Sequence, residues 1–240
     1  MSAAREDADV ETSSAGYARR FEGPVGRFFL DRQAEATLEL LRPFPGAGVL
    51  DVGGGHGQVT GPLVAAGHAV TVLGSDASCE ARVREWTATG RARFLAGNLL
   101  APPLPDRSHD VVLSYRLLPH VRRWPELVAT LCRLARLAVV VDYPTRRSVN
   151  AAVGILFGLK KGVEGNTRPF LVFSDAEVER EFARHGFRPT GRRRQFFFPM
   201  ALHRGLRSAR LTRALEGAAS ALGLTRALGS PVIVRLERRG

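Results

Sequence analysis

The sequence is poor in cysteine and has no long apolar run. Its only two cysteines, Cys79 and Cys132, lie in segments expected to be helical. They give neither a disulfide framework nor the ligand spacing of a metal site, so we expect a reducing compartment and no bound metal. No stretch reaches the roughly 20 apolar residues of a membrane span. The first ten residues carry acids and lack the apolar centre of a signal peptide. These absences predict a soluble cytoplasmic protein.

Acidic residues are scarce in the last quarter of the chain. Between Arg188 and Gly240 there are twelve arginines against two acids, Glu216 and Glu237, and the whole chain carries a formal net charge of +12. Such a region can bind an anionic membrane or nucleic acid, or it can be an ordinary solvated basic face. One helical seam of apolar residues crosses it, and we expect this seam to pack on the body of the fold, with membrane contact as the alternative. The seam consists of Leu211, Ala214, Leu215, Ala218 and Leu222.

The most informative segment is the glycine-dense run over residues 51–57. It reads Asp-Val-Gly-Gly-Gly-His-Gly and follows directly on an apolar strand. Glycine is needed where the backbone turns with positive φ or lies against a ligand. A pyrophosphate-binding Gly-x-Gly-x-x-Gly loop would need a third glycine where Gln58 or Thr60 stands. The run therefore favours a ligand without phosphates, held against bare backbone.

Strands and helices alternate through most of the chain. This order predicts a doubly wound α/β fold with a mostly parallel sheet, because short valine-rich strands are typical of parallel sheets covered on both faces. We expect residues 1–14 to be disordered and residues 15–240 to form one domain, with a helix over 149–159 and a helix opened by a capping box at Ser174 and Glu177. The expected strands are Gly48–Val52, Ala69–Leu73, Ala92–Ala96, Asp110–Tyr115, Leu137–Asp142, Arg192–Phe198 and Val232–Leu236.

Four segments together resemble the class I S-adenosylmethionine (SAM)-dependent methyltransferases, of the small-molecule type found in bacterial ubiquinone and menaquinone biosynthesis. The resemblance implies a seven-stranded sheet with a terminal antiparallel hairpin and a helical insertion before the last strand. Residues 15–145 would then bind SAM and residues 146–240 would shape the acceptor site. The segments are the glycine run, Gly97-Asn98-Leu99 with Leu104-Pro105, residues 109–115 with 118–121, and residues 173–187.

The resemblance also implies a cofactor site at the carboxyl ends of the first four strands. Asp51 and the loop glycines would hold the amino acid end of SAM, with His56 as a wall of the pocket. Two positions depart from the family: Gly74 stands where an acid normally takes the ribose hydroxyls, leaving Asp76 as the nearest carboxylate, and Asn98 stands where the family often has Asp. The implied cofactor-binding residues are Asp51, Gly53, Gly54, Gly55, His56, Gly57, Gly74, Ser75, Asp76, Gly97, Asn98, Leu99, Ser114 and Tyr115.

Methyl transfer to a hydroxyl or enol oxygen, or to carbon, needs alignment of the acceptor and can need a base. His120 is the candidate base, since it follows the fourth strand, and ligands bind at the carboxyl ends of such strands. His203, Tyr143 and Arg116 are weaker candidates. Aromatic side chains in the second half indicate a small hydrophobic or aromatic acceptor. They are Phe157, Phe170, Phe173, Phe196, Phe197 and Phe198.

Two other functions remain open. The basic charge is compatible with an RNA methyltransferase of the same fold, but Ser114-Tyr115-Arg116-Leu117 is unlike the motif of enzymes that methylate base nitrogens, and no RNA-binding module is visible. We therefore expect a small-molecule partner and no nucleic acid. The departures at Gly74 and Asn98 are compatible with a non-catalytic scaffold. The sequence predicts no oligomeric state.

Overall fold

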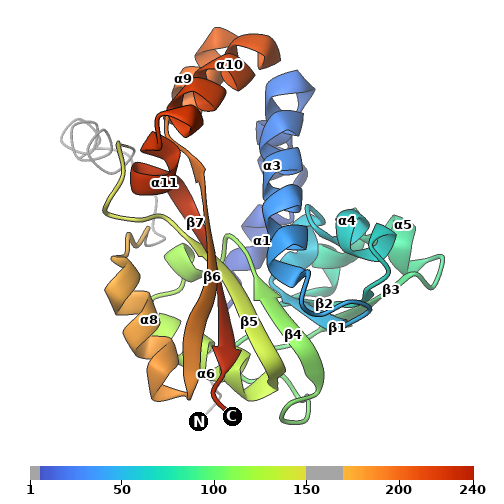
Figure 1. Cartoon of the computed structure of the whole chain (residues 1–240). Coiled ribbons are helices and arrows are strands. Elements are labelled where there is room, and N and C mark those ends of the chain that lie inside the picture. The colour runs from blue at the N-terminus through green and yellow to red at the C-terminus, as the bar shows by residue number, and fades with distance from the viewer. Residues whose placement is uncertain (1–5, 150–169) are drawn as a thin grey trace.

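A seven-stranded sheet organises the protein, which we describe from a computed structural model covering residues 6–149 and 170–240 (Figure 1). The strand order is β3-β2-β1-β4-β5-β7-β6. The first five strands are parallel, and β7 runs antiparallel to both of its neighbours. This confirms the predicted doubly wound, mostly parallel sheet. The strands are β1 (Gly48–Val52), β2 (Ala69–Gly74), β3 (Ala92–Ala96), β4 (His109–Ser114), β5 (Ala135–Tyr143), β6 (Phe187–Phe196) and β7 (Ser230–Arg238).

Helices cover both faces of this sheet. One apolar core joins Leu50 and Val52 of β1 to Leu131 of α6 and Phe182 of α8. On the opposite face, a second core joins Val49 to the helices α3, α4 and α5. The alternating side chains of a single strand therefore enter two different cores, as expected of a strand buried on both sides. The helices are α3 (Gly23–Leu41), α4 (Thr60–Ala65), α5 (Arg84–Thr87), α6 (Trp124–Leu134) and α8 (Asp175–Arg184).

Short helical turns complete the loops at the strand ends. The capping box predicted at Ser174 and Glu177 is present at the start of α8, where each side chain bonds the backbone N–H of the other residue. The turns are η1 (Arg19–Phe21), η2 (Gly54–His56), η3 (Ala77–Arg82) and η4 (Leu118–His120). In the described parts of the chain, no helix is long and apolar enough to cross a membrane.

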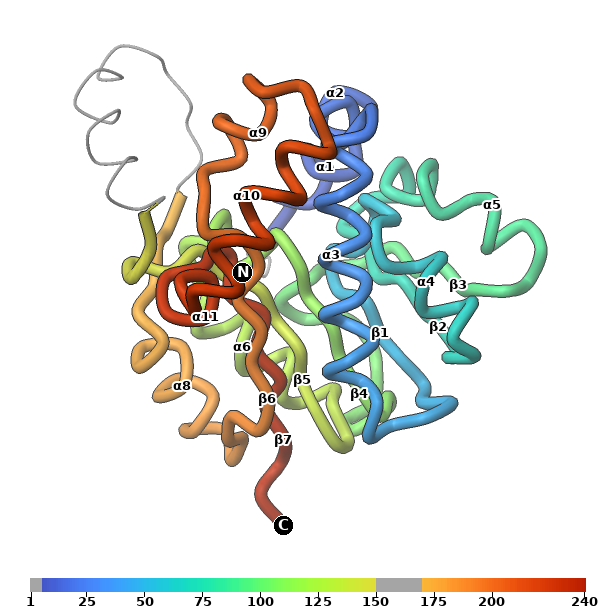
Figure 2. The backbone as a smooth tube through the Cα atoms, turned by 45° about the horizontal axis from the view of Figure 1, so that its top comes forward, coloured from blue at the N-terminus to red at the C-terminus, as the bar shows by residue number. Residues whose placement is uncertain are grey.

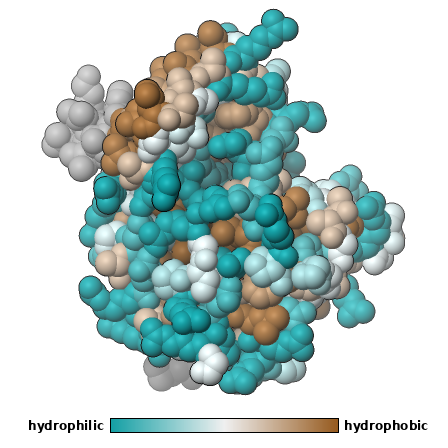
Figure 3. All heavy atoms as spheres, viewed as in Figure 1, coloured by the Kyte–Doolittle hydropathy of each residue, from teal (hydrophilic) through white to brown (hydrophobic). Residues whose placement is uncertain are grey.

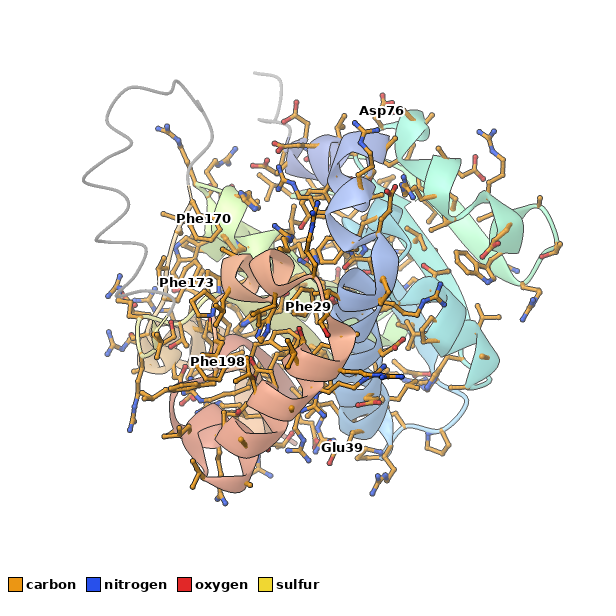
Figure 4. The ribbon with its side chains drawn as sticks, turned by 90° about the horizontal axis from the view of Figure 1, so that it is seen from above. Phe29, Glu39, Asp76, Phe170, Phe173 and Phe198 are labelled. Carbon is orange, nitrogen blue, oxygen red and sulfur yellow. The ribbon has the colours of Figure 1, made fainter. Side chains whose placement is uncertain are left out.

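The predicted insertion before the last strand consists of α9 (Met200–Leu206), α10 (Ala209–Ala221) and α11 (Leu224–Leu228). It rests on α3, as the tube in Figure 2 shows. Phe28 and Phe29 of α3 pack with Phe196 in a third apolar cluster. Phe29 lies between α3 and the insertion in Figure 4, and its ring centroid is 5.8 Å from that of His203 on α9.

The inward face of α10 is not the one that its apolar residues predict. Thr212, Glu216 and Ala219 are its buried residues, whereas Leu211 is 52% exposed. The Glu216 carboxylate accepts hydrogen bonds from the backbone N–H groups of Phe197 and Phe198 and pairs with His203 Nε2 at 2.8 Å. The expectation that the apolar seam packs on the body of the fold is therefore wrong, because this polar anchor turns the seam outward.

The expected disorder of residues 1–14 is also wrong over its described part. Residues 8–12 form α1 (Ala8–Thr12), which is followed by α2 (Ala15–Ala18). Ala8 and Asp9 are buried, and Ala8 belongs to the same apolar core as Leu73 and Leu99. A few buried contacts with the strand ends thus order a segment whose composition alone predicts no structure. The helix expected over residues 149–159, apart from its first residue, and Phe157 lie outside the described residues.

Candidate active site

The glycine run forms a tight turn at the carboxyl end of β1. Gly53 and Gly57 have positive φ, at 75° and 69°, and the turn η2 lies between them. A Cβ on Gly54 would lie 2.1 Å from the Asp51 carboxylate. Only glycine therefore leaves room for the Asp51 side chain to fold against the loop. The sequence places this turn correctly because its geometry is local.

Asp51 is fully buried, and neither of its carboxylate oxygens has a hydrogen-bond partner among the described residues. Burial, and to a lesser degree the nearby Asp142, raises the pKa of Asp51 to about 7. A buried acid without partners is unfavourable unless it gains a donor or a cation. Its position at the bare loop suits a ligand that carries an ammonium group.

His56 lies buried at the glycine loop, where the sequence predicts a wall of the cofactor pocket. Its Nδ1 atom accepts a hydrogen bond from the Gln58 backbone N–H at 3.1 Å. Burial, helped by the positive charge of Arg116, lowers the pKa of His56 to about 3. The imidazole is therefore neutral near pH 7, and its buried position suits a wall of the pocket.

Helix α1 covers the outer side of the glycine loop. Asp9 is 1% exposed, and its Oδ2 accepts hydrogen bonds from the Ser75 backbone N–H at 2.8 Å and from Cys79 Sγ at 3.5 Å. A Cβ on Gly55 would lie 2.4 Å from Ser13 Oγ. The space against the loop backbone is thus filled by residues 9–13. Sequence reasoning missed Asp9, since nothing in a short acidic segment indicates which strand end it will reach.

At the end of β2, the Asp76 carboxylate does not point toward the glycine loop. Asp76 is exposed, and its Oδ1 accepts a hydrogen bond from the Ser78 backbone N–H at the start of η3. Figure 4 shows it at the outer edge of the molecule. Gly74 is buried, and a Cβ there would lie 2.7 Å from the Cys79 Cβ. The suggestion that Asp76 reaches the ribose is therefore wrong, because this residue caps a helical turn.

The remaining residues predicted to bind the cofactor lie at the ends of β3 and β4, and their side chains have different surroundings. Gly97 bonds the Gly74 carbonyl, the Asn98 side chain accepts from the Leu100 N–H, and Leu99 is buried in the first core. Ser114 is buried, and its hydroxyl bonds the Val52 carbonyl. The Tyr115 side chain points into the opposite core and bonds Thr37 of α3. The Tyr115 side chain therefore points away from the predicted cofactor site.

Arg116 connects the glycine loop to the first helices. It adopts a positive φ of 57°, and its backbone N–H donates to Asp142 Oδ1 at 2.7 Å. Its guanidinium donates to Gln58, Gln33 and the Tyr17 hydroxyl at 2.7, 2.9 and 3.2 Å. Three elements distant in sequence are thus fixed around one planar cation.

A cavity of about 770 Å³ opens at the carboxyl ends of β4 and β5. His120 of η4 lines it, and the His120 ring centroid lies 5.6 Å from that of the exposed Phe170. Burial raises the pKa of Asp142, which also lines the cavity, against the opposing effect of Arg116. The lining residues are Tyr17, Arg116, Pro119, His120, Asp142, Pro144, Thr145, Arg146, Ser148, Phe170, Val172, Met200, Ser230 and Pro231.

The cavity contains only part of what the sequence suggests for it. Of the aromatic residues considered above, Phe170 lines it, whereas Phe173 and Phe196 are buried in apolar clusters. His203 is buried against Glu216, and the buried Tyr143 donates its hydroxyl proton to Asp175. Tyr17, Met200 and Pro231 were not foreseen, because only the fold brings these three segments together.

Comparison with known proteins agrees with this geometry. Residues 50–138 match the model of a family described as a methyltransferase domain. A search of curated protein sequences finds no match. Magnesium protoporphyrin IX methyltransferase from Synechocystis PCC 6803, solved with bound S-adenosylhomocysteine, superposes with a TM-score of 0.66 at 17% identity, covering 96% of this chain and 98% of that one.

Two further solved structures have the same fold. The 1,6-didemethyltoxoflavin-N1-methyltransferase of Burkholderia thailandensis gives a TM-score of 0.60 at 16% identity, covering 99% of this chain and 93% of that one. A geranyl diphosphate methyltransferase gives a TM-score of 0.59 at 17% identity, covering 86% of this chain and 77% of that one. The chain therefore has the fold of these solved methyltransferases, and residues 50–138 match a methyltransferase domain. The matched domain identifies the protein as an enzyme that transfers methyl groups.

Proposed function

We propose that the protein transfers the methyl group of SAM to an oxygen or carbon atom of a small, mostly apolar acceptor bound in the 770 Å³ cavity. The observation that carries this proposal is the position of His120 on the lining of an apolar cavity at the carboxyl ends of β4 and β5. A volume of this size suits a drug-sized ligand with a few polar anchors. Pro119, Phe170 and Val172 supply apolar surface, and Arg116 and Asp142 supply polar groups.

The residues at the loop fit the cofactor's chemistry. The unpartnered Asp51 carboxylate suits the ammonium group, and the backbone of Gly53 and Gly55 suits a close approach by the amino acid end. The Ser75 backbone N–H, now bonded to Asp9, stands at the strand end where the ribose is expected. Since residues 9–13 fill this space, we propose that α1 moves away from the loop when the cofactor binds.

When bound, SAM supplies an electrophilic methyl group on a sulfonium, so the protein's task is alignment and exclusion of water. His120 would act as the base that takes a proton from the hydroxyl or carbon acid of an acceptor in the cavity. The cavity walls hold the acceptor, and the buried Asp142 lies on the same lining as His120. Arg116 acts as a positioning residue through its bonds to Gln58 and Gln33.

Methyl-labelled SAM tests the acceptor class. Incubated with a metabolite extract, the protein should label an organic-soluble product. His120→Ala should lower kcat at least about tenfold while leaving SAM affinity unchanged. Label in the RNA fraction would contradict the proposed acceptor in favour of RNA methylation. An unchanged kcat in His120→Ala would remove the proposed base.

A further inference from the structure

The insertion presents an apolar ridge to the outside (Figure 3). Leu202 of α9 is 42% exposed, Leu211 of α10 is 52% exposed, and Leu222, just after α10, is 75% exposed. Ala214 and Ala218 are also exposed on α10. Contiguous apolar residues on one exposed face commonly mark an interaction surface. We call these five residues the outer ridge.

The helix α10, which carries most of the outer ridge, is firmly attached to the rest of the protein. Glu216 fixes α10 from the opposite side through His203 and two backbone N–H groups, and the Arg213 guanidinium lies 5.9 Å from the centre of the Phe28 ring. The orientation of α10 is therefore set by buried hydrogen bonds. Rotating the helix to bury its leucines would leave the buried His203 without its acid partner.

Only positive charge accompanies this ridge. Arginine side chains flank it on all three helices, and all of them are exposed. The one acid between residues 199 and 236 is Glu216, which is buried. In the described part of the chain, none of these arginines forms an ion pair with a carboxylate. The arginines are Arg204, Arg207, Arg210, Arg213 and Arg226.

We infer that the outer ridge and its arginines dock the enzyme on the surface of an anionic lipid bilayer. Leucines that enter the interface and arginines that meet acidic headgroups are the two requirements of an interfacial helix. A symmetric contact between two copies would bring like charges together. A nucleic acid would leave the leucines without an apolar partner, since its strands are bound through phosphates and base stacking.

The insertion that carries the outer ridge also reaches the acceptor cavity, because Met200, the first residue of α9, is part of the cavity lining. If the proposed function holds, a lipid-soluble acceptor can reach the site from the bilayer. The docking inference itself rests only on the insertion, so a failed methyl-transfer assay does not affect it.

Vesicle flotation with the full chain tests the inference. Vesicles of phosphatidylcholine with one quarter phosphatidylglycerol should bind the protein, pure phosphatidylcholine should bind it much less, and added salt should weaken binding. The doubly substituted Leu211→Asp/Leu222→Asp protein should lose binding by about tenfold or more, because both side chains are exposed and would carry charge into the interface.

A matched charge test separates this face from general basicity. Arg207→Glu/Arg210→Glu should reduce binding strongly, whereas Arg91→Glu/Arg93→Glu, which changes two exposed arginines at β3, should reduce it little. Equal loss in both variants would overturn the inference. Equal binding to neutral and anionic vesicles would also overturn it. A third contrary result would be a dimer of the parent protein in sedimentation that Leu222→Asp dissociates, with no vesicle binding by the parent or the variant.

Discussion

The carboxylate of Asp9 accepts a hydrogen bond from the Ser75 backbone N–H at 2.8 Å, which ties α1 to the carboxyl end of β2. This is the strand end at which the class normally carries an acid for its cofactor. Here the acid comes from another element, and it lies in front of the glycine loop. The cofactor site that we propose therefore overlaps with the space that α1 occupies.

Substitution of Asp9 by Ala should tighten SAM binding by up to about tenfold, because the bond that keeps α1 on the loop is lost and the binding-competent fraction rises. Titration calorimetry measures the change. Glu11→Ala, at an exposed position of the same helix, is the matched control and should leave the affinity unchanged. Weaker binding in Asp9→Ala would instead make Asp9 a direct cofactor ligand.

The affinity for SAM should fall as the pH drops from 8 to 6. The pKa of Asp51 is raised to about 7 by burial, so acid protonates this group and removes the charge that pairs with the cofactor's ammonium group. Binding measured across this range should follow one protonation. In Asp51→Asn binding should be weak and lose this dependence; a retained dependence would assign it to another group.

Asp51→Asn should be more stable than the parent protein at pH 8. The folded protein holds the Asp51 proton more tightly than the unfolded chain, whose aspartates titrate near about 3.9. The parent's free energy of unfolding therefore decreases as the pH rises from roughly 4 to 7, and the loss is complete above about 7. Denaturant titration at pH 4 and pH 8 measures it. If the free energies of unfolding of the parent and of Asp51→Asn differed by the same amount at pH 4 and pH 8, the burial of an unpaired carboxylate would be contradicted.

Glu216→Ala should destabilise the protein by about 2–4 kcal/mol, since it leaves His203 and two backbone N–H groups without their acceptor. Urea denaturation measures the loss. Glu35→Ala is the control, because Glu35 is exposed and faces Arg32 only at 3.7 Å. Similar stability in both variants would mean that Glu216 does not anchor α10.

Arg116→Lys should lower both stability and turnover. Lysine keeps the charge but cannot reproduce the planar fork that reaches Gln33, Gln58 and Tyr17 together, so a loss of about 1–3 kcal/mol is expected. Thermal unfolding and kcat with saturating SAM measure the two effects. An unchanged kcat with lowered stability would restrict Arg116 to a structural role.

The sequence by itself determined the features set by neighbouring residues. The strand β1 and the turn after it follow from valines ahead of a glycine run, and the start of α8 follows from Ser174 and Glu177. Alternation of such segments was sufficient to predict the parallel sheet, because crossovers of this kind have one favoured arrangement. The position of Asp51 at the loop required no more than this.

Only the tertiary structure decided which polar groups meet at a distance. Asp9 reaches Ser75 across 66 positions of sequence, and Arg116 joins the loop to α3. Glu216 sets which face of α10 is buried. Its carboxylate has three hydrogen-bond partners there, and these stabilise this orientation of the helix more than burial of the leucine seam would stabilise the opposite one. Periodicity reports which residues are apolar, whereas the inward side of a helix depends on the groups that face it.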